Sequence, residues 1–142
     1  VPEGTVEAIA EALDYRRLGK QRVEVLQILK AAMQSRSHGW RNHPATVMWA
    51  DNLAGLAHYG VTICDSWVAR GYKDTCREKI AQLVTPDPDD MPWWWGDPAM
   101  VESHRSNLVR KQPEHYGPMW PSVVHDLPYL WPKPGGRWTT TV

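Results

Sequence analysis

Proline is distributed very unevenly along this chain of 142 residues: ten of its twelve prolines lie at Pro86 or later. A proline inside a helix removes a backbone donor and clashes with the preceding turn, so long helices are expected mainly before Pro86. Six of the prolines fall within residues 113–134. We therefore expect that segment to lie over the rest of the domain in extended and turn conformations, without regular helix.

Outside the proline-rich stretches, apolar residues recur at helical spacing. Val6, Ile9 and Leu13 follow Thr5, which can cap a short helix. Asp97 and Pro98 provide the cap and first turn of a later one. No segment shows the alternation typical of a series of strands. The expected helices cover residues 6–13, 15–33, 44–60, 63–71, 74–84 and 98–111, with a loop at 35–42.

These patterns predict an all-α fold. A chain of this length is long enough for one domain with a real core and too short for two. We expect a single compact domain of about five to six helices over residues 1–134, followed by a loose tail at 135–142. The sequence has nine Trp and no Phe, so we expect the tryptophans to supply the aromatic bulk of the core.

Charge and composition exclude several classes of protein. Sixteen Lys and Arg balance sixteen Asp and Glu, so any site for a polyanion has to come from local clustering. No apolar run approaches the roughly 18 residues of a membrane helix and no signal peptide pattern is present, so a soluble, monomeric, cytoplasmic protein without a membrane partner is expected. Cys64 and Cys76 lack metal-type spacing and are interpreted as structural thiols, so no metal or other cofactor is expected.

Positive charge is nevertheless concentrated in the stretch DYRRLGKQR at 14–22, just before Glu24. On a helical wheel Arg22 falls on the apolar face of the helix, whereas Arg17 and Lys20 stand beside Glu24, with Lys20 within reach of a salt bridge. Glu24 then either pairs with Lys20 only, or stabilises a positive charge that develops on a sugar or aligns a nucleophile beside it.

The helix at 98–111 repeats this anomaly, because His104 and Arg105 interrupt its apolar rows. Such residues either lie at the core edge with their charged heads in solvent, or they line a shared polar cleft. Phosphate is the ligand that a cleft of this kind favours, since guanidinium groups match its oxygens in pairs. Arg16, Arg110 and Lys111 would add to the same charge.

Four segments carry a resemblance to a known family: LDYRRLGKQRVE, NHPATVMWADNLAGLAHYG, ICDSWVARGYKDT and SHRSNLVRKQPEHYGPMW. In this order they resemble the pyrimidine-dimer DNA glycosylase superfamily, the phage endonuclease V-like proteins, over roughly residues 13–132. The chain is most similar to a branch of bacterial and phage proteins. The resemblance implies a compact all-helical DNA repair enzyme that binds double-stranded DNA, flips a nucleotide out of the stack and cleaves the N-glycosidic bond of a damaged or modified base.

The resemblance also implies roles for individual residues. The catalytic carboxylate of the family, which follows an Arg on the first long helix, corresponds to Glu24 after Arg22. The family motif has this Arg and Glu adjacent, whereas Val23 separates them here. An ungapped match through YRRL instead places Arg17 at the position of the carboxylate and leaves Glu24 structural.

Other positions correspond to the DNA-binding parts of the family. The Arg that grips the phosphate backbone corresponds to Arg105, and the aromatic patch after it corresponds loosely to Tyr116 and Trp120. His43 matches a histidine in the equivalent segment, and a capping or packing role is an equal alternative. The full set of expected DNA-binding residues is Arg16, Arg17, Lys20, Arg22, His43, His104, Arg105, Lys111 and Tyr116.

The nucleophile is left open by the N-terminus. In well-known members the free α-amino group of a terminal Thr attacks the sugar and gives an imine, which leads to abasic-site lyase activity. Here the early threonine is Thr5, an internal residue, and the sequence begins at Val1. Either the natural terminus enters the cleft as an amine, or the protein is a monofunctional glycosylase in which Glu24 activates water.

Two further functions stay open beside base excision. One is a non-catalytic module that binds nucleic acid or protein on the same scaffold. The other is N-glycosidic hydrolysis on RNA or nucleosides. The three tryptophans at 93–95 either wedge into an opened duplex or pack the proline-rich tail. The expected location is the cytoplasm of a bacterial or phage-infected cell.

Overall fold

The computed structural model describes residues 6–33, 43–124, 126–133 and 136–140, so the cap expected at Thr5 and the loop expected at 35–42 lie outside the described residues. The described residues are mostly helical, which confirms the all-α prediction, with seven helices and one two-stranded sheet. The elements are α1 (Val6–Ala12), α2 (Tyr15–Met33), α3 (Pro44–Trp49), α4 (Leu53–Ala69), α5 (Cys76–Leu83), α6 (Pro98–Lys111), α7 (Pro113–Tyr116), β1 (Trp131–Lys133) and β2 (Arg137–Thr139).

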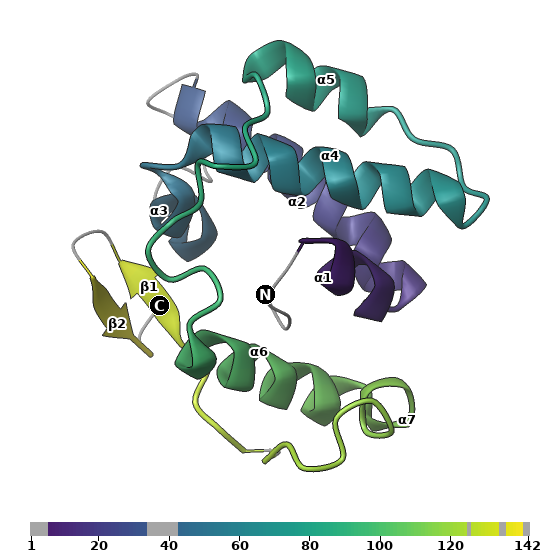
Figure 1. Cartoon of the computed structure of the whole chain (residues 1–142), viewed down its shortest axis with the longest axis vertical. Helices are drawn as coiled ribbons and strands as arrows, with labels where there is room; N and C mark the ends of the chain where they lie inside the picture. Colours follow the sequence, from purple (N-terminus) through teal and green to yellow (C-terminus); the bar gives the residue numbers. More distant parts are fainter. Residues whose placement is uncertain (1–5, 34–42, 125, 134–135, 141–142) are drawn as a thin grey trace.

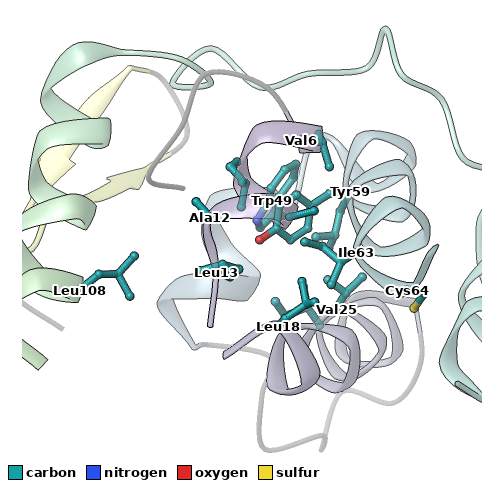
Figure 2. Packing of buried hydrophobic residues seen from close by; sticks show 14 of the residues in the cluster. Val6, Ala12, Leu13, Leu18, Val25, Trp49, Tyr59, Ile63, Cys64 and Leu108 are labelled. Atoms are coloured by element: carbon teal, nitrogen blue, oxygen red, sulfur yellow. The ribbon is translucent and has the colours of Figure 1, made fainter. Parts of the chain in front are cut away.

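Helices α2 and α4 form the centre of the fold, and α1 and α5 pack against them (Figure 1). Figure 2 shows side chains of α2 and α4, including Leu18, Val25 and Ile63, meeting between the two helices. Leu18 and Ile63 are fully buried, and Val25 is 2% exposed. The apolar stripe of the sequence is therefore the core face, because it is the face that α2 turns toward α4.

The helix expected at 44–60 is wrong in its bounds, because the chain breaks after α3 and then continues as one helix through Gly60 to Ala69. Gly60 does not end a helix here. A Cβ atom at Gly60 would lie 2.5 Å from Cγ1 of Val25, so the missing side chain lets α4 approach α2 closely. The break is stabilised by Asp90, whose carboxylate accepts from Asn52 Nδ2 at 3.0 Å and from Gly55 N at 3.2 Å in the first turn of α4.

The proline-rich segment lies over α6 as expected, apart from the single turn of α7. Two serines of α6 form hydrogen bonds to the backbone of this proline-rich segment. Ser103 Oγ donates to Pro128 O at 2.7 Å and accepts from Leu130 N at 2.7 Å. Ser106 Oγ accepts from Leu127 N at 3.1 Å. The helical turn of α7 begins at Pro113, where a missing N–H does no harm.

The segment expected as a loose tail contributes a strand. Arg137–Thr139 pairs antiparallel with Trp131–Lys133, with Trp138 opposite Pro132. The indole of Trp138 packs edge-to-face on Trp93, at 5.0 Å between ring centroids. Aromatic packing of this kind anchors a short hairpin that would be marginal on its own.

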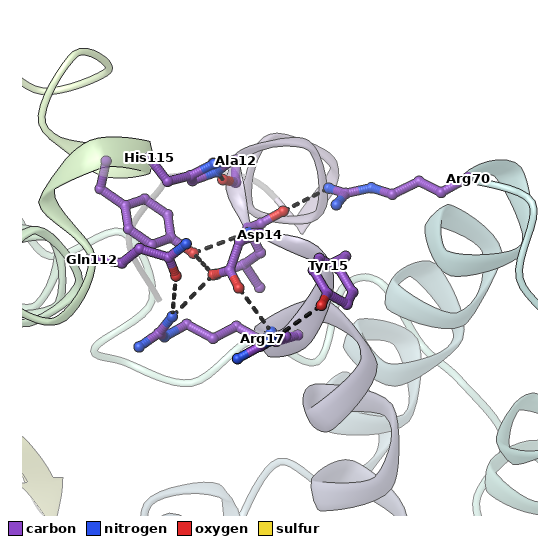
Figure 3. A network of polar contacts seen from close by, with 10 residues as sticks. Ala12, Asp14, Tyr15, Arg17, Arg70, Gln112 and His115 are labelled. Atoms are coloured by element: carbon purple, nitrogen blue, oxygen red, sulfur yellow. Dashed lines mark hydrogen bonds and ion pairs between the residues drawn. The ribbon is translucent and has the colours of Figure 1, made fainter.

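A polar network ties α6 and α7 to the corner between α1 and α2 (Figure 3). Asp14 is 5% exposed, accepts a hydrogen bond from the Tyr116 hydroxyl, and forms a 3.2 Å ion pair with Arg17. Arg17 also donates to Gln112 Oε1 at 2.8 Å, and His115 Nε2 lies 3.1 Å from Ala12 O. This network fixes the C-terminal half of the chain to the N-terminal helices. None of the helices in the described ranges is long and apolar enough to span a membrane.

Candidate active site

A cleft of about 850 Å³ opens between the central helices and the C-terminal half of the chain. One wall comes from α2, with Glu24 at its middle, and from α4. The other wall comes from α6 and from the chain that leads into β1. The polar and charged residues that line it are Arg17, Lys20, Gln21, Glu24, Gln27, His43, Tyr59, His104, Asn107, Lys111, Tyr129 and Thr140.

Glu24 is partly accessible from the cleft, with 28% of its side chain exposed. Lys20 Nζ, one turn earlier on α2, lies 3.6 Å from Glu24 Oε1, which confirms the salt bridge expected from the spacing. Gln21 Nε2 donates to Glu24 Oε2 at 3.0 Å. The hydroxyl of Tyr59 on α4 in turn donates to Gln21 Oε1 at 2.7 Å. Glu24 is thus an accessible carboxylate held between a cation and a neutral donor.

Three cations from two helices line the cleft together with this carboxylate. Lys20 and Lys111 are exposed and extend into solvent. Arg17 is held by Asp14 and Gln112 and is 28% exposed, so one part of its guanidinium is engaged and the rest faces the cleft. Charges on opposite walls are placed to contact a polyanion that enters between them.

Aromatic rings cover the wall opposite α2. His104 is 6% exposed and stacks on Tyr129, with ring centroids 4.5 Å apart and planes 15° apart. Burial holds the pKa of His104 well below its usual 6.5, so the ring is neutral at physiological pH. Burial, assisted by the negative charge of Glu24, raises the pKa of Tyr129 to about 12. This part of the wall is therefore aromatic and uncharged, and the positive charge of the wall comes from Lys111.

His43 stands at the end of the cleft, before the first residue of α3. Its Nδ1 accepts from Ala45 N at 3.1 Å, which is the capping role that the sequence left open. Its ring packs edge-to-face on Trp131, with centroids 6.3 Å apart. His43 therefore combines a capping role with a place in the cleft wall.

Four residues of the expected DNA-binding set do not line this cleft. The exposed Arg16 donates to Tyr15 OH at 3.0 Å. Arg22 forms an ion pair with Asp74, on the apolar face where the wheel places it. The Arg105 guanidinium lies 5.2 Å from the ring centroid of Trp120, and Tyr116 is buried against Asp14.

Sequence reasoning missed Gln21, Tyr59 and Tyr129. Gln21 precedes Glu24 by three residues, so the helical spacing could have indicated their contact. Tyr59 and Tyr129 come from distant parts of the chain, and no local pattern points to them. Of the three tryptophans at 93–95, Trp94 is 1% exposed and donates to Met48 O at 3.2 Å, while Trp93 is 44% exposed and packs on Trp138.

Metal ligation finds no support in the part of the chain that the structure describes, where no group of three or more His, Cys, Asp or Glu could hold an ion. Cys64 and Cys76 are free and buried, and burial raises the pKa of the Cys64 thiol. The arrangement instead offers a carboxylate, exposed cations and an aromatic wall. It can bind an anionic, ring-bearing ligand and place one carboxylate beside it.

Comparison with known protein families matches the chain to the family described as pyrimidine dimer DNA glycosylase, over residues 2–79. The matched residues carry the wall of α2 and α4, with Glu24, Gln21 and Tyr59, whereas α6 and Tyr129 lie beyond them. No curated protein and no solved structure matches the chain.

Proposed function

The chain belongs to the pyrimidine dimer DNA glycosylase family, and from this premise we propose that it excises a damaged or modified base from duplex DNA, with Glu24 as the catalytic carboxylate. The family match confirms the resemblance in the sequence and supports DNA glycosylase activity at the level of the family. The choice of lesion, the residues and the route are our proposal.

The position of Glu24 carries the proposal. Among the described residues that line the cleft, Glu24 is the one that carries a carboxylate. Lys20 lies 3.6 Å from it, and Arg17 and Lys111 line the same cleft, with Lys111 on the opposite wall. Lys20 and Lys111 bind the phosphates on either side of the target nucleotide, where they displace condensed counterions. Glu24 then faces the sugar between these phosphates.

Glu24 acts on the N-glycosidic bond. In the water route, the oxygen of a water molecule bonds to C1′ of the sugar while Glu24 accepts its proton. The bond from C1′ to the base nitrogen breaks, and its electron pair leaves with the base. The negative charge of Glu24 also stabilises the positive charge that develops on the sugar ring as the bond lengthens.

An amine nucleophile is the alternative to water. A primary amine attacks C1′, the base leaves, and opening of the sugar gives an imine that leads to strand cleavage at the abasic site. This route adds abasic-site lyase activity to base excision. The two routes leave different products, which makes them separable by experiment.

The test is incubation of the protein with duplexes that carry single lesions, a pyrimidine dimer first, with and without borohydride. An abasic site that forms without a trapped adduct indicates the water route, and a trapped adduct indicates an amine. Lys20→Arg and Lys111→Arg each keep the charge but remove a primary amine from the cleft, so loss of the adduct in one variant identifies that lysine. Persistence of the adduct in both variants points to the α-amino terminus. The enzymatic proposal fails if no lesion is processed under conditions where the duplex is bound.

A binding module without catalysis is the second candidate, because Arg22 and Arg105 are engaged with Asp74 and Trp120 and do not line the cleft. It predicts salt-dependent binding that Glu24→Gln leaves intact and no base release from any duplex. RNA and free nucleosides serve as further substrates in the same assay. We further propose that the protein acts as a monomer inside a bacterial or phage-infected cell.

A further inference from the structure

We propose that Gln21 and Tyr59 are positioning residues that fix the carboxylate of Glu24 before the substrate binds. The proposal rests on the proposed function, because it assigns these residues to the proposed catalytic group. It goes beyond that function by naming how the carboxylate is held.

The three side chains form one continuous hydrogen-bonded path across two helices. Tyr59 OH on α4 donates to Gln21 Oε1 at 2.7 Å, and Gln21 Nε2 on α2 donates to Glu24 Oε2 at 3.0 Å. Gln21 lies one helical turn before Glu24, so both side chains leave the same face of α2. All three residues line the cleft.

Tyr59 is the fixed end of this path. It is 5% exposed, and its ring packs against Trp49 at 6.0 Å and Trp95 at 6.2 Å between centroids. Burial, with a smaller contribution from the charge of Glu24, raises the pKa of Tyr59 above its ordinary value. The hydroxyl is therefore protonated at physiological pH and can always donate.

The donor at Tyr59 determines the orientation of the Gln21 amide. Because the hydroxyl donates to it, the amide presents its oxygen to Tyr59 and its NH₂ group to Glu24. A reversed amide would place its oxygen against the carboxylate, which is unfavourable. Both contacts thus favour the same orientation of the amide. Through them, Gln21 connects the buried Tyr59 on α4 to the accessible carboxylate of Glu24 and restricts its motion.

Glu24 gains a fixed geometry from this arrangement. Its Oε2 accepts from a neutral amide, and its Oε1 faces Lys20 at 3.6 Å. Lys20 is 74% exposed and can turn away to contact phosphate, whereas Gln21 stays in place. The carboxylate therefore keeps its orientation when Lys20 changes partner, which is the kind of preorganisation that speeds a chemical step.

The first experiment measures single-turnover rates and apparent KM on a lesion duplex. Tyr59→Phe is expected to lower the rate roughly 3- to 10-fold, the range that one uncharged hydrogen bond contributes, with KM unchanged. Gln21→Ala, which removes a donor to a charged group, is expected to lower it about 10- to 100-fold. Adding Tyr59→Phe to Gln21→Ala should cause no further loss, because the path is already broken. Additive losses would overturn the proposal.

Controls separate positioning from general damage to the fold. Tyr72→Phe removes the hydroxyl of a tyrosine that is 42% exposed and outside the cleft, and Gln82→Ala shortens an exposed glutamine on α5. Both are expected to keep the wild-type rate. Gln21→Glu keeps an acceptor for Tyr59 but removes the donor to Glu24, so it should be at least as slow as Gln21→Ala. A wild-type rate in Gln21→Glu would contradict the proposal.

A second measurement does not depend on activity. The side-chain amide of Gln21, assigned by its absence in Gln21→Ala, is followed in a ¹⁵N correlation spectrum. Tyr59→Phe and Glu24→Ala should each shift this signal, and Tyr72→Phe should not. If the Gln21 signal does not shift in these variants, the hydrogen-bonded path is refuted even if the enzyme is active. If the signal shifts but the protein processes no lesion, the path stands and the proposed function is refuted.

Discussion

Arg22 and Asp74 form an ion pair that is almost enclosed by protein, with 14% and 4% of their side chains exposed. The guanidinium also lies 4.6 Å from the ring centroid of Trp67. Asp74 further accepts from Cys76 N at 3.1 Å and from Arg77 N at 2.9 Å, at the start of α5. The pair therefore joins α2 to the turn that begins α5, and Arg22 serves the fold on the side of α2 that faces away from the cleft.

Asp74→Ala should strongly destabilise the protein. It leaves the Arg22 charge buried without its partner, which typically costs about 3–5 kcal/mol. Asp65→Ala removes the exposed Arg77 pair, in which both side chains are more than half exposed, and should cost less than about 1 kcal/mol. Urea denaturation of both variants measures the two free energies of unfolding. Equal losses of stability in the two variants would show that the Arg22–Asp74 pair stabilises the fold no more than an exposed ion pair does.

Glu24→Gln should abolish cleavage of the N-glycosidic bond and leave the fold intact. Loss of a general base typically lowers a rate about 10²- to 10⁴-fold, while the isosteric amide retains the packing. Binding to the lesion duplex should persist, since a negative charge near phosphate is removed. Single-turnover assays, with binding measured in parallel, test this expectation, and Glu78→Gln on the exposed surface of α5 is the matched control. Activity that survives in Glu24→Gln would remove Glu24 from the mechanism.

Lys20→Ala combined with Lys111→Ala should weaken binding to all duplexes alike. Each lysine that contacts a phosphate contributes about 0.9 to the slope of log affinity against log salt, so the double variant should lose about 2 from this slope. Lys30 and Lys79 line a small hollow between α2 and α5, and their double alanine variant should keep the wild-type slope. Salt titrations by fluorescence anisotropy, in the Glu24→Gln background, measure both slopes.

Stability should fall with decreasing pH because of His104. Its pKa is lowered in the folded state by burial, so folding favours the neutral ring. The contribution is fully present above the unfolded pKa near 6.5 and is lost as the pH falls toward the native pKa, at up to about 1.4 kcal/mol per pH unit. His104→Asn should flatten this dependence between pH 6.5 and 5, as measured by urea denaturation.

Gly60→Ala should destabilise the protein although alanine favours helix by about 1 kcal/mol. The new Cβ would lie 2.5 Å from Val25 Cγ1 and 3.0 Å from Ile80 Cδ1, and overpacking of this kind typically costs about 1–3 kcal/mol. Thermal denaturation measures the loss. Adding Val25→Ala makes room for the Cβ, so the double variant should lose less stability than the two single losses added together.

The helices were predictable where the residues that end them are neighbours in the sequence. The bounds expected for the helix at 98–111 agree with α6, because Asp97 caps it by accepting from Ala99 N at 2.9 Å. The end expected at Gly60 was wrong because the reason for that glycine is Val25, 35 positions earlier on another helix. Local patterns give caps and faces, but they do not show when a glycine serves a contact between helices.

The contacts of the candidate site were also predictable only where the spacing on a single helix determines them. The spacing on α2 indicated that Lys20 pairs with Glu24 and that Arg22 lies on the apolar face; the pair forms, and only 14% of the Arg22 side chain is exposed. It could not indicate that Asp74 is the partner of Arg22, since that contact depends on the packing of α5. Neighbours on α6 also diverge, because His104 turns toward Tyr129 and Arg105 toward Trp120. Successive side chains of a helix point about 100° apart, so these two neighbours face different parts of the chain.

The two walls of the cleft come from different parts of the chain, and the family match at 2–79 includes only the wall with Glu24. The wall of His104, Lys111 and Tyr129 is attached through the contacts of Asp14 with Tyr116 and of Arg17 with Gln112. Under the proposed function, the catalytic carboxylate and part of the binding surface therefore lie on two different segments, which are also joined by the packing of Trp94 on Trp49 and of Trp131 on His43. A hybrid protein that keeps residues 1–79 and exchanges the C-terminal half is a direct route to altering which lesion such a scaffold selects, provided that these contacts are carried over.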